Sequence, residues 1–244
     1  MAYLKTKSGI ILHAVAAMLL FASLGAAQIP GLCDTGQTAA TSSGCTGVVV
    51  PINPIHGGPN RDGNWALAYP YPTPMTSLKT PCELTSFVPA WVDSLAGGWL
   101  PNSATSEWIE PYDGEDDRPA GWYIYATRFA VPAVLPDGSV PTGLIVNGQL
   151  ASDNATALIY LESPARSTNC NLVSGQTFPV NPNGSSLDYS QWWPFSFTNK
   201  GAITPGAEAY LFFAVQNSYD SSQPNGGSQQ GLRVEFFATS TFTH

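Results

Sequence analysis

The sequence contains little charge and almost no histidine. Only 11% of its 244 residues are charged, and its 3 histidines include His13, which lies in an apolar N-terminal run. The sequence therefore has almost no candidate residues for a histidine-based metal centre or catalytic triad. Acidic residues outnumber basic ones by 17 to 9, giving a formal net charge of −8. Such a chain repels phosphate backbones and anionic lipids, so we expect neither a nucleic-acid partner nor a membrane partner.

Recognised catalytic motifs are also absent. The sequence has no Gly-x-Ser-x-Gly elbow, no zincin helix and no phosphate-binding loop. A glycosidase would need two positioned carboxylates, and the sequence alone cannot pair the candidates. These candidates are Asp93, Glu107, Glu110, Asp153 and Glu162. We therefore expect no catalytic residues and no organic cofactor.

The N-terminus predicts export. Lys5 and Lys7 precede an apolar run from residue 10 to 24, and small residues follow at 25–27. This is the pattern of a cleavable signal peptide with its cut near Ala27-Gln28. The run is shorter than the roughly 20 residues of a spanning helix. We expect residues 1–27 to be removed and the remaining protein to be secreted.

Four cysteines, an even number, lie in the remaining chain: Cys33, Cys45, Cys82 and Cys170. In an oxidising compartment this number favours two disulfides, for which three pairings are possible. The favoured pairing joins Cys33 to Cys45, closing a short Gly/Ser/Thr-rich loop, and Cys82 to Cys170. Zinc is disfavoured because no Cys-x-x-Cys spacing is present.

Short β-branched and aromatic runs alternate with turn clusters from residue 61 to the end, and no long helical stripe appears. The expected strands span residues 64–69, 86–91, 107–110, 121–131, 143–150, 155–161, 172–180, 193–197, 208–216 and 232–239. In the fourth run, Trp122, Ile124 and Ala126 alternate with Tyr123 and Tyr125, which predicts one face in a core. We expect an all-β antiparallel sandwich of the jelly-roll type over 61–244. Residues 28–60 are expected to form an irregular, disulfide-tied N-terminal segment.

Several spaced motifs add a resemblance. They are Asp62-Gly63-Asn64-Trp65, Ser106-Glu107-Trp108-Ile109-Glu110-Pro111, the run 121–129, the run 148–155, Pro205-Gly206 ahead of the run 211–217, and the run 231–236. Together they resemble an uncharacterised family of bacterial secreted domains that is often found with a PEP-CTERM sorting tail. The resemblance implies a galactose-binding-like jelly roll, the architecture of many carbohydrate-binding modules. No sorting tail precedes His244, and Leu161-Glu162-Ser163 replaces the usual Leu-Asn-Gly.

Aromatic side chains in loops are the candidate ligand contacts. Sugar rings pack their C–H faces on Trp or Tyr and pair their hydroxyls with polar side chains. We nominate Trp99, Trp193 and Tyr219, with Asp153 and Asn217 as polar partners, while the alternative for these two is Asx-type bonding to the backbone. Trp192 and Trp193 are adjacent, so one of them must point away from the core in an extended segment.

An acidic loop is the candidate metal site. Asp113, Glu115, Asp116 and Asp117 lie within five residues, and a hard cation such as Ca²⁺ offsets their repulsion with oxygen ligands. The alternative is a solvated turn. For Arg233, pairing with Glu235 or another acid is favoured over a role in binding.

Taken together, these patterns favour a secreted, non-catalytic module that binds glycans or another extracellular polymer. The alternatives are a structural subunit of an extracellular assembly, in which self-association is expected, and a carbohydrate-active hydrolase.

Overall fold

The computed structural model describes residues 29–36, 61–69, 86–92, 98–111, 119–163, 172–177, 189–200, 203–217, 221–222 and 226–244. These residues form strands and turns but no helix. Among them, therefore, no helix is long and apolar enough to cross a membrane. The strands are β1 (Arg61–Tyr69), β2 (Ser86–Val92), β3 (Ile109–Glu110), β4 (Gly121–Ala130), β5 (Gly143–Asp153), β6 (Ala155–Glu162), β7 (Leu172–Thr177), β8 (Trp193–Asn199), β9 (Glu208–Asn217), β10 (Gly231–Phe236) and β11 (Thr241–Thr243).

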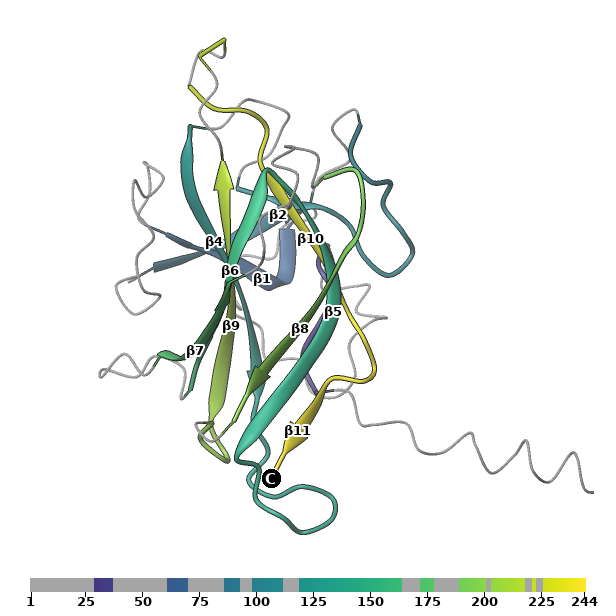
Figure 1. Cartoon of the computed structure of the whole chain (residues 1–244), viewed down its shortest axis with the longest axis vertical. Coiled ribbons are helices and arrows are strands. Elements are labelled where there is room, and N and C mark those ends of the chain that lie inside the picture. The colour runs from purple at the N-terminus through teal and green to yellow at the C-terminus, as the bar shows by residue number, and fades with distance from the viewer. Residues whose placement is uncertain are drawn as a thin grey trace, which may run out of the picture.

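All pairings between these strands are antiparallel, and they form one curled sheet. The order is β11-β5-β10-β3-β2-β1-β4-β9-β6-β7, with β8 on the other edge of β5. The sheet folds over so that β5 approaches β9 and β7 approaches β8. Figure 1 shows β5, β8, β10 and β11 along one side and β4, β6, β7 and β9 along the other. The predicted fold class, an all-β antiparallel sandwich, is confirmed.

The main core lies between these two layers, because alternate side chains of each strand point inward. In β8, Phe195 and Phe197 are buried, whereas Pro194, Ser196 and Thr198 are exposed. Trp65 of β1 stacks with Phe236 of β10 at a centroid distance of 6.1 Å and lies 5.4 Å from Phe213 of β9. Core contacts therefore join strands that are far apart in the sequence.

The layer that contains β4 and β9 is buried on both faces. Tyr123 and Tyr125 belong to the main core, whereas Ile124 and Ala126 belong to a second cluster with Phe212 of β9. The expectation that β4 buries a single face is therefore wrong. Alternation fixed which side chains share a face, but it could not reveal that the second face is buried as well.

The ten predicted strands are all present, with boundaries that differ by a few residues. The run predicted over 232–239 is the main correction, because β10 ends at Phe236 and a separate strand, β11, follows. Both strands pair with the same edge of β5. Between them, the Phe237 N–H donates to Asn147 O at 2.8 Å, and the Asn147 N–H donates to Ser240 Oγ at 2.9 Å. The chain thus bulges for a few residues and then resumes pairing.

Residues 29–36 form turns that pack into the sandwich. Ile29, Leu32 and Cys33 are fully buried, and the first two belong to the main core. Cys33 is not a free thiol. Cys45, Cys82 and Cys170 lie outside the described residues, so the predicted pairing stays a prediction.

Candidate functional site on the outer face of β5, β8 and β10

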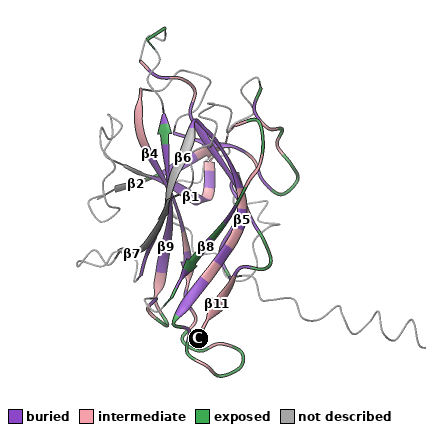
Figure 2. Ribbon diagram, in the orientation of Figure 1, coloured by how far each residue is buried: buried purple, intermediate pink, exposed green. Residues whose placement is uncertain are grey.

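The layer formed by β5, β8 and β10 turns a polar face away from the core. Leu144, Val146 and Leu150 of β5 enter the main core, so the alternate residues of β5 point outward. Figure 2 shows exposed residues along β8 and alternating buried and partly exposed residues along β5. We call this surface the outer face. It is composed of Asn147, Gln149, Ala151, Trp192, Pro194, Ser196, Arg233 and Glu235, with Ser103 and Thr105 from the loop before β3.

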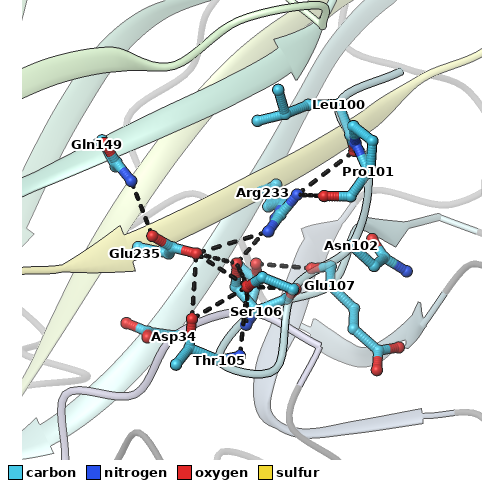
Figure 3. Close-up of polar contacts among 12 residues, drawn as sticks. Asp34, Leu100, Pro101, Asn102, Thr105, Ser106, Glu107, Gln149, Arg233 and Glu235 are labelled. Carbon is cyan, nitrogen blue, oxygen red and sulfur yellow. Dashed lines mark hydrogen bonds and ion pairs between the residues drawn. The ribbon is translucent and has the colours of Figure 1, made fainter. Parts of the chain in front are cut away.

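Register places Gln149 of β5 opposite both Pro194 of β8 and Glu235 of β10. Gln149 Nε2 donates to Glu235 Oε2 at 2.8 Å, and three hydroxyls surround the other carboxylate oxygen. Ser106, Ser103 and Thr105 donate to Oε1 at 2.7, 3.2 and 3.2 Å. Figure 3 shows this convergence on Glu235. These hydrogen bonds to the Glu235 carboxylate therefore hold the loop before β3 against β10.

Glu235 stays ionised because these donors outweigh its burial. Burial alone would raise the pKa of the carboxyl group, but hydrogen bonds from Ser106, Gln149 and Ser103, together with the charge of Arg233, lower the pKa below its usual range. Its side chain retains 19% exposure. A negative charge is thus held at the edge of the outer face.

Arg233 supplies the positive charge beneath this carboxylate. Its side chain is only 1% exposed, and its Nη2 lies 3.5 Å from Glu235 Oε1. Its Nε–H donates to Ser106 Oγ at 2.8 Å, and Nη1 donates to the carbonyls of Leu100 and Pro101. Burial lowers the pKa of Arg233, while the carboxylates of Glu235 and Glu107 raise it. The favoured interpretation of Arg233 as a structural ion-pair partner is confirmed.

Asp34 lies on the other side of this cluster, in the N-terminal segment (Figure 3). Its Oδ1 accepts the backbone N–H of Phe236 at 2.7 Å. Burial raises the pKa of Asp34 to about 7, an effect that the Phe236 hydrogen bond opposes and that Glu235 strengthens. One carboxyl group of the cluster is therefore fixed in the charged form, and the other titrates near neutral pH.

Trp192 is the partly exposed aromatic residue of the outer face. The Arg233 guanidinium lies 4.6 Å from its ring centroid, a cation–π distance. Trp192 also packs against a cluster composed of Trp99, Trp108 and Ala151. Because Arg233 is itself held by Ser106 and two backbone carbonyls, the indole rests on a fixed support.

Trp99 and Asp153, two of the nominated ligand contacts, are bonded to each other. Trp99 is only 6% exposed, packs against Trp108 with a centroid distance of 4.3 Å and an interplanar angle of 38°, and donates its indole N–H to Asp153 Oδ2 at 2.9 Å. The expectation that Trp99 is an exposed loop aromatic is wrong, because a contact 54 residues away in sequence buries it. A ligand role for either residue stays a prediction.

Asn217, the other nominated polar residue, joins the same end of the sandwich. Its side chain accepts from Ser228 Oγ at 3.1 Å and donates to the Ser228 and Pro119 carbonyls at 3.0 and 3.3 Å. Ser228 also contacts Asn154, whose Nδ2 donates to Asp153 Oδ1 at 2.6 Å. These contacts tie loops together, and they join side chains to one another or to distant carbonyls rather than forming the local Asx-type bonds given as the alternative.

Trp192 and Trp193 point to opposite sides of the layer, as their adjacency requires. The residue on the outer side is Trp192 rather than the nominated Trp193. Trp193 packs against the main core, whereas Trp192 lies with the outer cluster. Tyr219 lies outside the described residues, as do Asp113, Glu115, Asp116 and Asp117. Within the described part of the chain, no three His, Cys, Asp or Glu side chains gather as a metal site.

Sequence reasoning missed Trp192, Gln149 and Glu235 as members of one surface. The alternation of β5, β8 and β10 did carry a signal, because each of these residues neighbours core positions. What the pattern lacked was the cross-strand register that brings them together.

No protein-family model and no curated protein matches this sequence. Among solved structures, the enzymatically active domain of bacteriophage CBA120 tailspike protein 4 aligns with 83% of this chain and 23% of its own, at 13% identity and a TM-score of 0.40. The present chain thus spans about a quarter of that protein.

Two carbohydrate-binding modules are also similar. TmCBM61, solved in complex with β-1,4-galactotriose, aligns with 56% of this chain and 70% of its own, at 7% identity and a TM-score of 0.32. The C-terminal CBM6 of the laminarinase LamC from Zobellia galactanivorans aligns with 56% of this chain and 85% of its own, at 14% identity and a TM-score of 0.28. At TM-scores below 0.5, these likenesses establish neither a family nor a function.

Proposed function

We propose that this chain is a secreted carbohydrate-binding domain that holds a glycan on the outer face, with Trp192 as the stacking platform. The observation that carries the proposal is the partly exposed Trp192 indole on a fixed guanidinium, within one surface that also presents amide, hydroxyl and carboxylate groups. Flat C–H faces of sugars pack on such a ring, and their hydroxyls pair with such groups.

The fixed geometry of the outer face favours binding. Glu235 is held by four side-chain donors other than Arg233, and Gln149 is oriented by its own bond to that carboxylate. Side chains that are already ordered lose little conformational entropy when a ligand arrives. A shallow sugar-binding surface can therefore use a small number of polar contacts efficiently.

Charge favours neutral over acidic glycans. The partly exposed ionised group within the outer face is the Glu235 carboxylate, while the compensating Arg233 is buried. The whole chain adds a net charge of −8. A polyuronate would meet repulsion from both, so we infer a neutral polysaccharide as the ligand class.

The test is binding of the mature chain to neutral polysaccharides, including β-1,4-galactan and β-1,3-glucan, with alginate as the acidic comparison. Trp192→Ala should weaken binding by about 1–2 kcal/mol, whereas Trp192→Phe should retain part of it. Val134→Ala, at a side chain that is 54% exposed in the β4–β5 connection, is the matched surface control.

Melting curves keep the interpretation clear, because a binding loss counts only if the variant stays folded. A parent protein that binds none of the neutral polysaccharides would overturn the proposal. Equal binding by the parent and Trp192→Ala would exclude the outer face as the site.

A further inference from the structure

The second edge of β10 is completed by a separate segment of chain. One edge of β10 pairs with β5 over its whole length, whereas its pairing with β3 consists of Leu232 opposite Ile109. Beyond this pair, residues 34 and 35 take the place of a neighbouring strand. An open strand edge is a template for another extended chain, so whatever occupies this position decides what can associate there.

Side-chain oxygens do much of the pairing at this edge. The Thr35 N–H donates to Val234 O at 3.1 Å, as a strand would. In contrast, the Val234 N–H donates to Thr35 Oγ1 at 3.0 Å, and the Phe236 N–H donates to Asp34 Oδ1 at 2.7 Å. The segment therefore satisfies the edge without being a regular strand.

Apolar contacts accompany these bonds. Ile29 and Leu32 are fully buried in the main core, and the Trp65 indole N–H donates to the carbonyl of Cys33 at 2.9 Å. If the segment left, two core positions would empty and two β10 N–H groups would lose their acceptors. Unpaired buried donors and cavities are both costly. The sandwich therefore requires a segment that makes these contacts at this place.

The contacts do not require the segment to come from the same copy. Those to β10 join residues 199 and 202 positions apart, so the covalent chain does little to dictate them. Residues 37–60, a connection of 24 residues, separate the segment from β1. With Cys33 joined to Cys45, as the favoured pairing has it, the 15 residues 46–60 remain free, and fully extended they reach about 50 Å. That length is sufficient to deliver the segment to a neighbouring molecule.

We propose that residues 29–36 are an exchangeable donor segment, and that the β10 edge of a second copy of this chain is its alternative acceptor. Reciprocal exchange gives a dimer, and onward exchange gives a chain of subunits. The resident segment has the advantage of high effective concentration, so exchange between copies increases with protein concentration. This inference is independent of glycan binding.

The test uses the mature chain and a fluorescent peptide of residues 28–38 that carries Cys33→Ala. In the chain variant Thr35→Ala, the Val234 N–H loses its acceptor, Thr35 Oγ1. At equal peptide concentration, this variant should bind at least 10-fold more peptide than the parent chain does. A peptide with Leu32→Asp is the matched control and should not bind, because its carboxylate would enter the core. Failure of the first peptide to bind the Thr35→Ala chain, or equal binding of the control, would overturn the donor role.

Two further measurements examine exchange between whole copies. The parent, incubated at high concentration just below its melting temperature, should form dimers or longer species that persist after dilution, as measured by light scattering. A parent that remains monomeric overturns the exchange between copies. Disulfide mapping is equally decisive, since Cys33 joined to Cys45 moves with its segment, whereas Cys33 joined to Cys82 or Cys170 would anchor it.

Discussion

The indole N–H of Trp99 donates a 2.9 Å hydrogen bond to Oδ2 of Asp153, so the loop before β3 is joined to the end of β5. Gly231 of β10 lies against the same indole, because a Cβ atom added there would come within 2.6 Å of it. Trp99 therefore closes one end of the outer face and supports the cluster on which Trp192 packs.

Trp99 should accordingly be a stability residue. We expect Trp99→Ala to lower the free energy of unfolding by about 3–5 kcal/mol, the usual cost of removing a buried large aromatic. Trp99→Phe should cost less than Trp99→Ala, because it keeps one aromatic ring near Trp108, although it loses the hydrogen bond to Asp153 and part of the buried indole volume. Denaturant titration measures both, with Val134→Ala as an exposed control expected within about 0.5 kcal/mol. A Trp99→Ala variant as stable as the parent would contradict the buried position.

The sequence predicted the strands well because their signal is local. Period-two alternation and turn residues identify β8 from its own seven residues. The break between β10 and β11 escaped prediction because Asn147, on a different strand, bonds to the residues between them. A bulge of this kind is fixed by the partner strand rather than by its own residues.

The candidate site was less predictable because its members meet only through tertiary contacts. The loop position of Trp99 suggested exposure, but Trp108 and Asp153 bury it. The adjacency of Trp192 and Trp193 correctly predicted that they point to opposite sides. Nothing in the local sequence specified which of the two faces the core. Glu235 is defined by donors 86 to 132 positions away, which no window of sequence reveals.

Oxidation of the exported protein is the second prediction. We expect secreted protein to begin at or near Gln28 and to contain no free thiol, with Cys33 paired to Cys45 and Cys82 paired to Cys170. N-terminal sequencing and mass spectrometry after alkylation without reductant provide the measurement. Material that starts at Met1, or alkylated Cys82 or Cys170, would contradict it.

Calcium binding by the acidic loop is the third prediction. If Asp113, Glu115, Asp116 and Asp117 share a Ca²⁺ ion, calcium at 100 times its dissociation constant should stabilise the fold by about 2.7 kcal/mol. This corresponds to a rise in melting temperature of roughly 5–10 °C for a chain of this size. The double variant Asp116→Asn/Asp117→Asn is the control and should not respond. An unchanged melting temperature in millimolar Ca²⁺ would leave a solvated turn.

The last prediction concerns Asp34 and the pH dependence of stability. Burial raises its pKa in the folded protein to about 7, above the ordinary value of 3.8. Between these values the folded state binds more protons than the unfolded state, so stability falls as pH rises from about 4 to 7. At about 1.4 kcal/mol per pH unit, the whole effect is at most about 4 kcal/mol.

Asp34→Asn should remove this dependence while keeping an oxygen that accepts the Phe236 N–H. The charges of Glu235 and Arg233 act on Asp34, and Glu235 has a lowered pKa, so its own contribution is lost only at more acidic pH. Burial raises the pKa of Glu107, so Glu107 also lowers stability as pH rises, in the parent and in the variant alike. The difference between parent and Asp34→Asn in denaturant titrations at pH 5 and pH 8 therefore isolates Asp34. We expect the parent to lose stability between these values and the variant to lose much less, because its amide does not ionise. Parallel profiles would show that Asp34 is already charged at pH 5 in the folded protein.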